Sequence, residues 1–139
     1  KIINNLEIDR IQAPLNILDK RFYNSGLLKE FKTRGIQFVA RSIFLQGLLI
    51  TSNIKKNPIF DKHAKTLSNF HTWCNKNKYH PIEVCLSIAF DELVSQIIIG
   101  ASSLGELLKV TSIARGLKEP INYQCSNEIS STLIDPRKW

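Results

Sequence analysis

Three short segments of the chain combine polar side chains with small residues, and these are residue types that contact anionic ligands. They are Gln12–Asn16, Arg41–Gly47 and Gly100–Glu106. In the last segment, small residues that let a ligand approach the backbone precede a predicted helix start, where free N–H groups attract anions. Two interpretations are open for it: a phosphate-binding turn, or a capped helix with nothing bound.

Arg41 interrupts the longest apolar run of the chain, Ile36–Ile50. A charged side chain in such a run is expected to be paired or to have a function. We therefore weigh two roles for Arg41: contact with an anionic ligand, or a structural ion pair with Asp19 or Glu7.

Other residues with catalytic potential do not complete a known site. His71 and Cys74 lie three residues apart on a predicted helix, and His63 lies two turns earlier. No fourth ligand accompanies them, so helix packing explains these residues and we expect no bound metal. The sequence contains no motif of a serine hydrolase, a zinc protease or a phosphate-binding glycine loop.

The composition is that of one globular domain with a basic surface. The 139 residues include 19 basic and 12 acidic side chains, which gives a net charge of +7 and a pI near 9.5. This balance favours an anionic partner. The basic residues show no interleaved aromatic pattern, so we expect no specific nucleic-acid binding.

The remaining composition bears on location and completeness. Cys74, Cys85 and Cys125 are an odd number without CxxC spacing, which favours a reducing cytoplasm over a disulfide scaffold. Polar residues interrupt every apolar stretch, so we expect no membrane span. The chain contains no methionine, and we interpret it as a segment of a longer protein.

Hydrophobic patterning predicts strands that alternate with helices. Buried strands are expected at Arg10–Pro14, Ile36–Ala40 and Val94–Ile99. Helices are predicted over Gly26–Thr33, from Ser103 to Arg115 and near Asn127–Leu133. A helix that begins at Pro58 is expected to bury Phe60, Ala64, Leu67, Phe70 and Cys74. Another helix that begins at Pro81 is expected to bury Val84, Cys85, Ile88 and Ala89. Ser103 and Glu106 have the spacing of a capping box.

This alternation is typical of a parallel α/β sheet, whose strands are buried on both faces. The carboxyl ends of parallel strands meet at one edge, and ligands bind there. The three polar segments each follow or end a predicted strand. We therefore expect them to converge on one site.

The segments Ile11–Asn16, Ala40–Leu49 and Ile98–Ser103 resemble, in order and spacing, the last three barrel strands of the aldo-keto reductase family. Ile134–Trp139 resembles the closing segment of its bacterial members. The resemblance covers essentially all of residues 1–139 and implies a single segment, the C-terminal part of an incomplete (β/α)8 TIM barrel. It also implies an oxidoreductase that uses NADP or NAD to reduce a small carbonyl substrate by hydride transfer.

The resemblance implies positions that contact the nicotinamide dinucleotide. Gln12 matches the amide that bonds the nicotinamide carboxamide, and Arg41 falls where many members stack an aromatic ring on the nicotinamide. Ser42, Phe44 and Gln46 match the loop along the pyrophosphate. The adenosine end is matched by Gly100, Ala101, Ser103 and Glu106.

The chain departs from the family pattern in two respects. Glu106 stands where the family usually carries arginine or glutamine, and Lys109-Val110 replaces a Glu-Asn pair. A carboxylate there opposes a 2′-phosphate, so we expect weak discrimination between NADPH and NADH or a tilt toward NADH. The family's catalytic aspartate, tyrosine, lysine and histidine belong to the first half of the barrel, so no catalytic residue is assigned within this chain.

The sequence thus predicts a portion of a cytoplasmic aldo-keto reductase that holds cofactor-contacting positions and is inactive by itself. The alternative is a non-catalytic nucleotide-binding or interaction module built from a partial barrel. Three strands cannot close a barrel, and open sheet edges pair with other chains. We therefore expect the isolated segment to self-associate.

Overall fold

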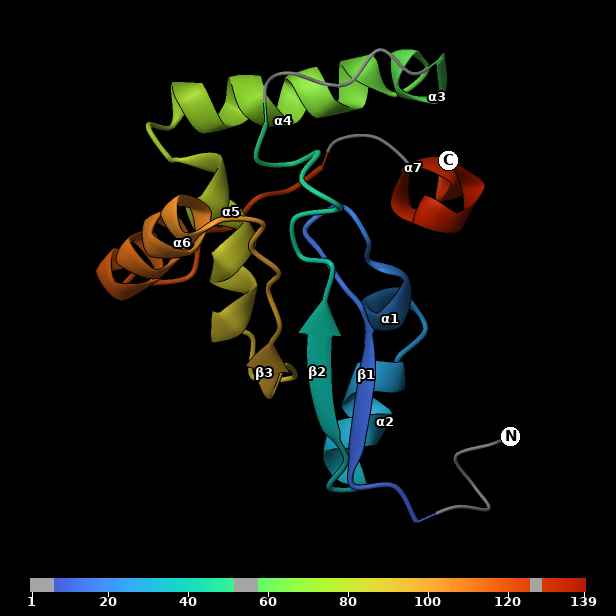
Figure 1. Ribbon diagram of the computed structural model, residues 1–139. Helices are drawn as coiled ribbons and strands as arrows, with labels where there is room; N and C mark the ends of the chain where they lie inside the picture. The colour runs from blue at the N-terminus through green and yellow to red at the C-terminus, as the bar shows by residue number, and fades with distance from the viewer. Residues whose placement is uncertain (1–6, 52–57, 126–128) are drawn as a thin grey trace.

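A three-stranded parallel sheet forms the centre of the computed structural model, which describes residues 7–51, 58–125 and 129–139. The strands are β1 (Arg10–Pro14), β2 (Gln37–Arg41) and β3 (Gln96–Ile97), in the spatial order β1-β2-β3 (Figure 1). Pro14 pairs with Arg41, so the carboxyl ends of β1 and β2 lie level. The predicted parallel α/β fold class is confirmed in this form.

The first β/α unit is close to the prediction. Helix α2 (Leu27–Thr33) follows Gly26, whose φ of 75° favours glycine, and leads into β2. Phe38 of β2 packs against Phe31 of α2, with ring centroids 6.1 Å apart. The segment before Gly26, expected to be a loop, contains the short helix α1 (Arg21–Asn24).

The helical region between β2 and β3 differs from the prediction in its continuity. It forms α3 (Pro58–Asp61), α4 (Ala64–Lys76), α5 (Pro81–Leu86) and the 3-10 helix η2 (Ser87–Phe90). The single helix expected from Pro58 is therefore wrong, because the chain turns between α3 and α4. Ala64 and Ala89, expected to be buried, are exposed.

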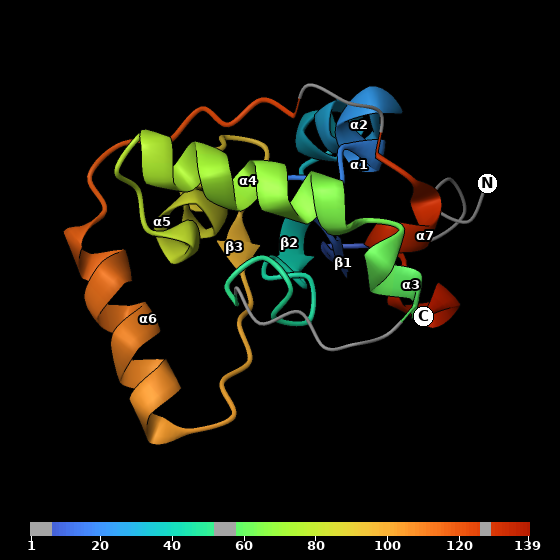
Figure 2. The same ribbon diagram turned by 90° about the horizontal axis from the view of Figure 1, so that it is seen from above.

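The buried faces of α4 and α5 otherwise match the prediction. Leu67, Phe70 and Cys74 of α4 are fully buried, and Val84 and Cys85 of α5 are fully buried as well. His80 begins α5 with a reciprocal cap: its ring Nδ1 accepts from Ile82 N at 3.1 Å, and its own N–H donates to Glu83 at 2.6 Å. The two helices cover the carboxyl end and the β3 side of the sheet (Figures 1 and 2).

The third strand is shorter and more exposed than expected. The prediction of a fully buried strand over Val94–Ile99 is wrong, because only Gln96 and Ile97 join the ladder and Ile98 is 46% exposed. β3 is the edge strand, so its outer side has no neighbouring strand within the described residues. Side chains of a strand are buried on both faces only where other layers cover the sheet, and the exposure of Ile98 shows that this segment is not covered throughout.

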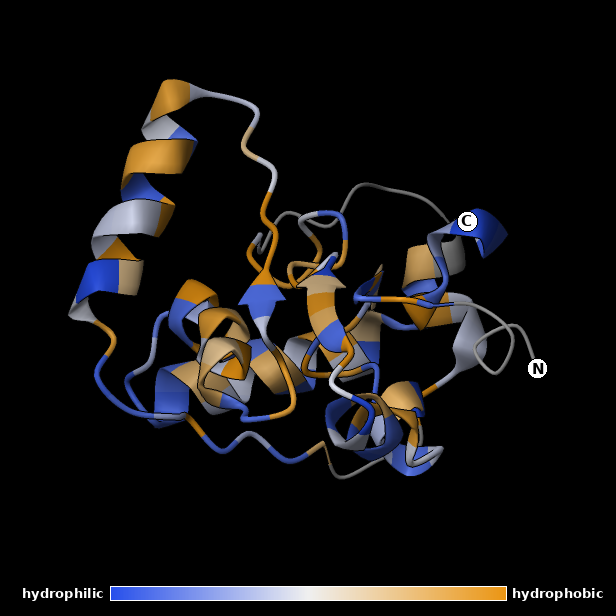
Figure 3. Cartoon of the chain, turned by 90° about the horizontal axis from the view of Figure 1, so that it is seen from below, coloured by the Kyte–Doolittle hydropathy of each residue, from blue (hydrophilic) through white to orange (hydrophobic). Residues whose placement is uncertain are grey.

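Helix α6 (Leu104–Gly116) follows β3 as predicted and lies beside α5 (Figure 2). It projects from the sheet on the side opposite α1 and α2, and it carries apolar bands in Figure 3. Leu104, Leu107 and Leu108 are exposed, whereas Val110 is buried.

The chain closes beside the carboxyl end of β1 with α7 (Ser131–Ile134) and the 3-10 helix η3 (Pro136–Lys138). A short helix is present at Ser131–Ile134, which begins later than the expected range Asn127–Leu133; Asn127 and Glu128 lie outside the described residues. The indole N–H of Trp139 donates to the Thr132 carbonyl at 3.0 Å, and its ring meets Phe60 edge-on at 5.2 Å. No helix in the described residues is long and apolar enough to cross a membrane.

Candidate functional site

A groove of about 530 Å³ lies at the carboxyl ends of β2 and β3. Its walls come from two loops about sixty residues apart in sequence, one after each strand. Seven of the nine positions predicted to contact a cofactor line this groove, namely Arg41, Ser42, Phe44, Gln46, Gly100, Ala101 and Glu106. The Arg41–Gly47 and Gly100–Glu106 segments therefore lie together at this groove, whereas no residue of Gln12–Asn16 lines it.

The loop after β2 has an unusual backbone. Ser42, Leu45 and Gln46 have φ values of 58°, 48° and 54°, and Gly47 follows at 86°. Left-handed conformations of non-glycine residues cost on the order of 1–2 kcal/mol each, so the surrounding structure must enforce them. At Leu45, the packing around its fully buried side chain enforces the left-handed conformation.

Tight turns complete this loop. Leu45 N donates to the Ser42 carbonyl at 2.9 Å, and Gly47 N donates to the Phe44 carbonyl at 3.0 Å. Within the described part of the chain, the backbone N–H groups of Ile43, Phe44 and Gln46 donate no hydrogen bond. A turn with left-handed residues and unused amides is suited to an anion such as a pyrophosphate.

Arg41 ends β2 at the rim of the groove. The guanidinium lies 3.5 Å from the Ser42 hydroxyl and forms no ion pair among residues 7–51, 58–125 and 129–139. The structural ion pair considered for it is therefore wrong, because Asp19 instead binds Arg21 through Nη2 at 2.7 Å. Arg41 retains its charge for another partner.

Glu106 closes the opposite wall. Its carboxylate accepts from the Ser102 N–H and from the Ser102 hydroxyl, both at 2.7 Å. These bonds from Ser102 hold the pKa of Glu106 below its ordinary value, so the side chain is ionised at neutral pH. The carboxylate of Glu106 therefore occupies the Ser102 N–H, which an anionic ligand could otherwise use as a hydrogen-bond donor.

Ser103 caps α6 by accepting from Glu106 N at 3.2 Å. The predicted capping box is therefore only half formed: Glu106 returns its bond to Ser102 instead of Ser103. Ser103 itself does not line the groove. It supports the wall by fixing the start of α6.

Gln12 also lies outside the groove but on the same face of the sheet. Side chains alternate along a strand, so Gln12 shares a face with Pro14, which pairs with Arg41. Gln12 is exposed on this face. It is therefore placed to meet a ligand that extends from the groove across β1.

The histidines and the cysteine considered for a metal are dispersed. His63 Nε2 lies 2.9 Å from Thr132 Oγ1, whereas Cys74 is buried, which raises the pKa of its thiol to about 11. The described residues contain no group of three or more His, Cys, Asp or Glu side chains able to hold a metal ion.

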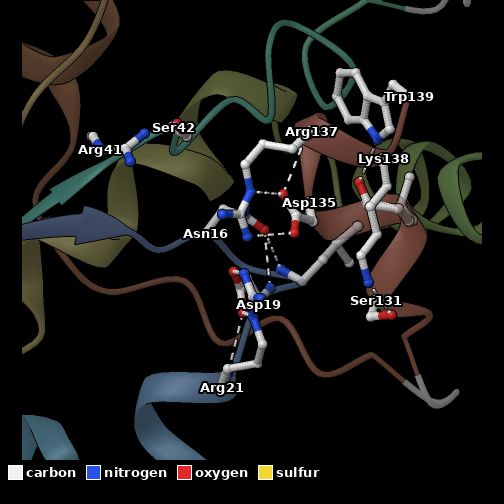
Figure 4. Close-up of polar contacts among 12 residues, drawn as sticks. Asn16, Asp19, Arg21, Arg41, Ser42, Ser131, Asp135, Arg137, Lys138 and Trp139 are labelled. Atoms are coloured by element: carbon white, nitrogen blue, oxygen red, sulfur yellow. Dashed lines mark hydrogen bonds and ion pairs between the residues drawn. The ribbon is translucent and has the colours of Figure 1, made fainter.

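The sequence reasoning missed part of this region. Ser102 and the apolar residues Ile98 and Ile99 line the groove; Ser102 lies between the predicted positions Ala101 and Ser103, and Ile98 and Ile99 directly precede Gly100. Two Asp-x-Arg pairs, Asp19 with Arg21 and Asp135 with Arg137, also lie nearby (Figure 4). Their repeated spacing was visible in the sequence.

The chain is an α/β protein with a parallel sheet and a groove at the carboxyl ends of its strands, the edge of such sheets where ligands bind. The family model of the Aldo/keto reductase family matches residues 3–120, and the chain belongs to this family, a family of oxidoreductases. No curated protein sequence matches the chain.

Proposed function

We propose that the chain forms the dinucleotide groove of an aldo-keto reductase that reduces a carbonyl substrate with NADPH or NADH. One observation carries the proposal: two distant loops bring seven of the nine expected contact positions around one cavity of about 530 Å³. In this proposal the sheet is the C-terminal part of a (β/α)8 barrel, and the protein acts in the cytoplasm.

The chemistry of the groove fits a dinucleotide. The left-handed turn from Ser42 to Gly47 offers backbone donors for a pyrophosphate, and Arg41 adds a positive charge that has no acidic partner among the described residues. Gln12 offers an amide on the adjoining face of β1. The apolar side chains of Ile98 and Ile99 line the groove toward Gly100 and Ala101, where an adenine ring would rest.

The bound nicotinamide would supply the hydride to the carbonyl carbon. The groove's own residues would bind and orient the dinucleotide, with the planar guanidinium of Arg41 against the nicotinamide ring and Gln12 on its carboxamide. The titratable groove residues within the described chain are Arg41 and Glu106. A guanidinium does not act as a proton donor near neutral pH, and the carboxylate of Glu106 is ionised there, so neither group can protonate a carbonyl oxygen.

The lack of a proton donor among the groove residues of the described chain also favours a second candidate function, a nucleotide-binding module without catalysis. Both candidates predict dinucleotide binding. They differ in turnover by the longer protein: the reductase oxidises NADPH when an aldehyde is added, and the module does not. For residues 1–139 alone we expect no oxidation of NADPH with any of a panel of aldehydes.

The direct test is a fluorescence titration of NADH and NADPH into the chain and into Arg41→Gln. Removing the unpaired guanidinium should weaken both cofactors by about tenfold, the scale of one charge-assisted hydrogen bond. Lys118→Gln, which removes an exposed charge beyond the end of α6, is the matched control and should change neither affinity. Absence of saturable binding to the unmodified chain would reject the proposal.

Cofactor choice depends on Glu106. Its ionised carboxylate occupies the Ser102 donors and would repel a 2′-phosphate, so NADPH should bind no better than NADH. Glu106→Arg reverses the charge and frees the amide, and should raise NADPH affinity about tenfold relative to NADH. A strong NADPH preference that Glu106→Arg leaves unchanged would place the 2′-phosphate elsewhere.

A further inference from the structure

A second cavity, of about 490 Å³, lies beside the dinucleotide groove and shares Arg41 with it. Three arginines from distant parts of the chain line this cavity: Arg21 from α1, Arg41 from the end of β2 and Arg137 from η3. Figure 4 shows Arg21 and Arg137 with their aspartates in one cluster, and Arg41 with Ser42 to one side. Asp135 also lines the cavity, and because like charges repel, the three guanidinium groups require compensating anions.

Two of the arginines are held in fixed positions by buried carboxylates. Asp19 is fully buried and accepts from Arg21 Nε at 2.8 Å and from Arg21 Nη2 at 2.7 Å. Asp135 is also buried and accepts from Arg137 Nε and Nη2, both at 2.8 Å. Such forked pairs fix the plane of each guanidinium before a ligand arrives.

The forks leave donors unused. Each pair employs the Nε–H and one Nη2–H, so the Nη1 edges of Arg21 and Arg137 remain without a partner among the described residues. Arg41 has no acidic partner within residues 7–51, 58–125 and 129–139. Three positive charges against two carboxylates leave a net charge of +1 around the cavity.

The rest of the wall is mostly apolar. Pro14, Phe22, Leu27 and Ile134 line the cavity, and Ser25 adds a hydroxyl group. A bare inorganic ion would leave these apolar side chains without contact. The lining therefore suits a small molecule with a short carbon body and an oxyanion at one end.

From this combination of preset guanidinium donors, net positive charge and apolar walls, we infer that the second cavity binds the oxyanion of a small organic phosphate or carboxylate. The ligand would lie against the carboxyl end of β1, with Arg41 between it and the dinucleotide groove. This inference does not depend on the proposed reductase function, because the site is built from residues that, apart from Arg41, the groove does not use.

Calorimetric titration of the 139-residue chain with glycerol 3-phosphate, inorganic phosphate and malonate tests the inference. Saturable binding of glycerol 3-phosphate or malonate, tighter than that of inorganic phosphate, is expected. The stronger of the two organic probes distinguishes a phosphate ligand from a carboxylate ligand. Absence of saturable binding for both organic probes would overturn the inference.

Two variants locate the site. Arg41→Gln leaves no carboxylate unpaired and should weaken the preferred probe about tenfold. Arg137→Lys keeps the charge opposite Asp135 but removes the fork, so it should weaken that probe while NADH affinity stays unchanged. Lys118→Gln, the matched control, should leave probe affinity unchanged. Equal losses in Lys118→Gln and Arg41→Gln would show that general surface charge is responsible, and would overturn the inference.

The same titrations separate this inference from the proposed function. Probe binding that Arg137→Lys weakens, in a chain that fails to bind NADH, would support the anion cavity and reject the dinucleotide groove. NADH binding without binding of either organic probe would support the dinucleotide groove and reject the anion cavity.

Discussion

The ion pair between Asp19 and Arg21 offers a direct test of how the loop after β1 is held. Asp19 is fully buried, while the Arg21 side chain is 49% exposed. Arg21→Met keeps the length of the side chain and removes its donors. The buried carboxylate would then retain only the backbone bond from residue 21, which measures 3.2 Å in the native chain.

The size of the effect follows from the lost contacts. Hydrogen bonds to charged groups contribute about 1.5–3 kcal/mol each, and two of them disappear. Because the guanidinium is half exposed, water enters in its place and returns part of this energy. We expect a net loss of about 2–3 kcal/mol in the free energy of unfolding, out of roughly 7–20 kcal/mol for a chain of this length.

Urea denaturation followed by circular dichroism measures this loss. With a slope of about 1–3 kcal/mol per molar urea, the midpoint should fall by about 0.7–3 M at unchanged slope. Arg115→Met, in the last turn of α6 and exposed, is the matched control and should change stability by less than about 0.5 kcal/mol. A midpoint for Arg21→Met equal to that of the control would refute the reasoning.

Three further predictions concern acid stability, helix capping and association. The hydrogen bond from Arg137 lowers the pKa of Asp135 from 3.8 to about 2. The ion pair therefore stabilises the fold above pH 4 and loses this contribution as the pH falls toward 2. Asp135→Asn should remove the fall of the urea midpoint between pH 4 and pH 2 that comes from this pair. Ser103→Ala removes the N-cap bond to Glu106 N and should destabilise α6 by about 1 kcal/mol, seen as faster hydrogen exchange in its first turn, with Ser112→Ala as the unchanged control. The unpaired edge of β3 and the exposed leucines of α6 should give a mass that rises with concentration in light scattering; a monomer at all concentrations would contradict this.

Features set by local sequence could be predicted. The apolar runs at β1 and β2, the glycine at position 26 and the prolines at positions 58 and 81 indicated where elements begin. Strand direction follows from the alternation with helices, because a parallel connection needs a crossover. The convergence of the loops after β2 and β3 on one groove was therefore predictable from order alone.

The hydrogen-bond partners of individual side chains and their solvent exposure could not be predicted as well from the sequence. The apolar run Val94–Ile99 indicated a buried strand, yet burial depends on the layers that pack over the sheet, and these leave Ile98 46% exposed. Glu106 has the spacing of a capping-box residue, but the carboxylate reaches Ser102 because the turn before α6 presents that amide to it. The hydrophobic periodicity of the sequence predicts neither the exposure of the Val94–Ile99 segment nor the contact between Glu106 and Ser102.

The sequence by itself determined the class of the fold, the order of the strands and the polar segments at their carboxyl ends, since these depend on local hydrophobic period and on connection rules. Only the tertiary structure decided which charges meet. Asp19 binds Arg21 and Asp135 binds Arg137, which leaves Arg41, between the two cavities, without an ion pair in the part of the chain that the structure describes. Both pairs join residues two apart, so each partner is local in sequence, but only the packing that buries Asp19 and Asp135 decides that these pairs form and that neither aspartate pairs with Arg41.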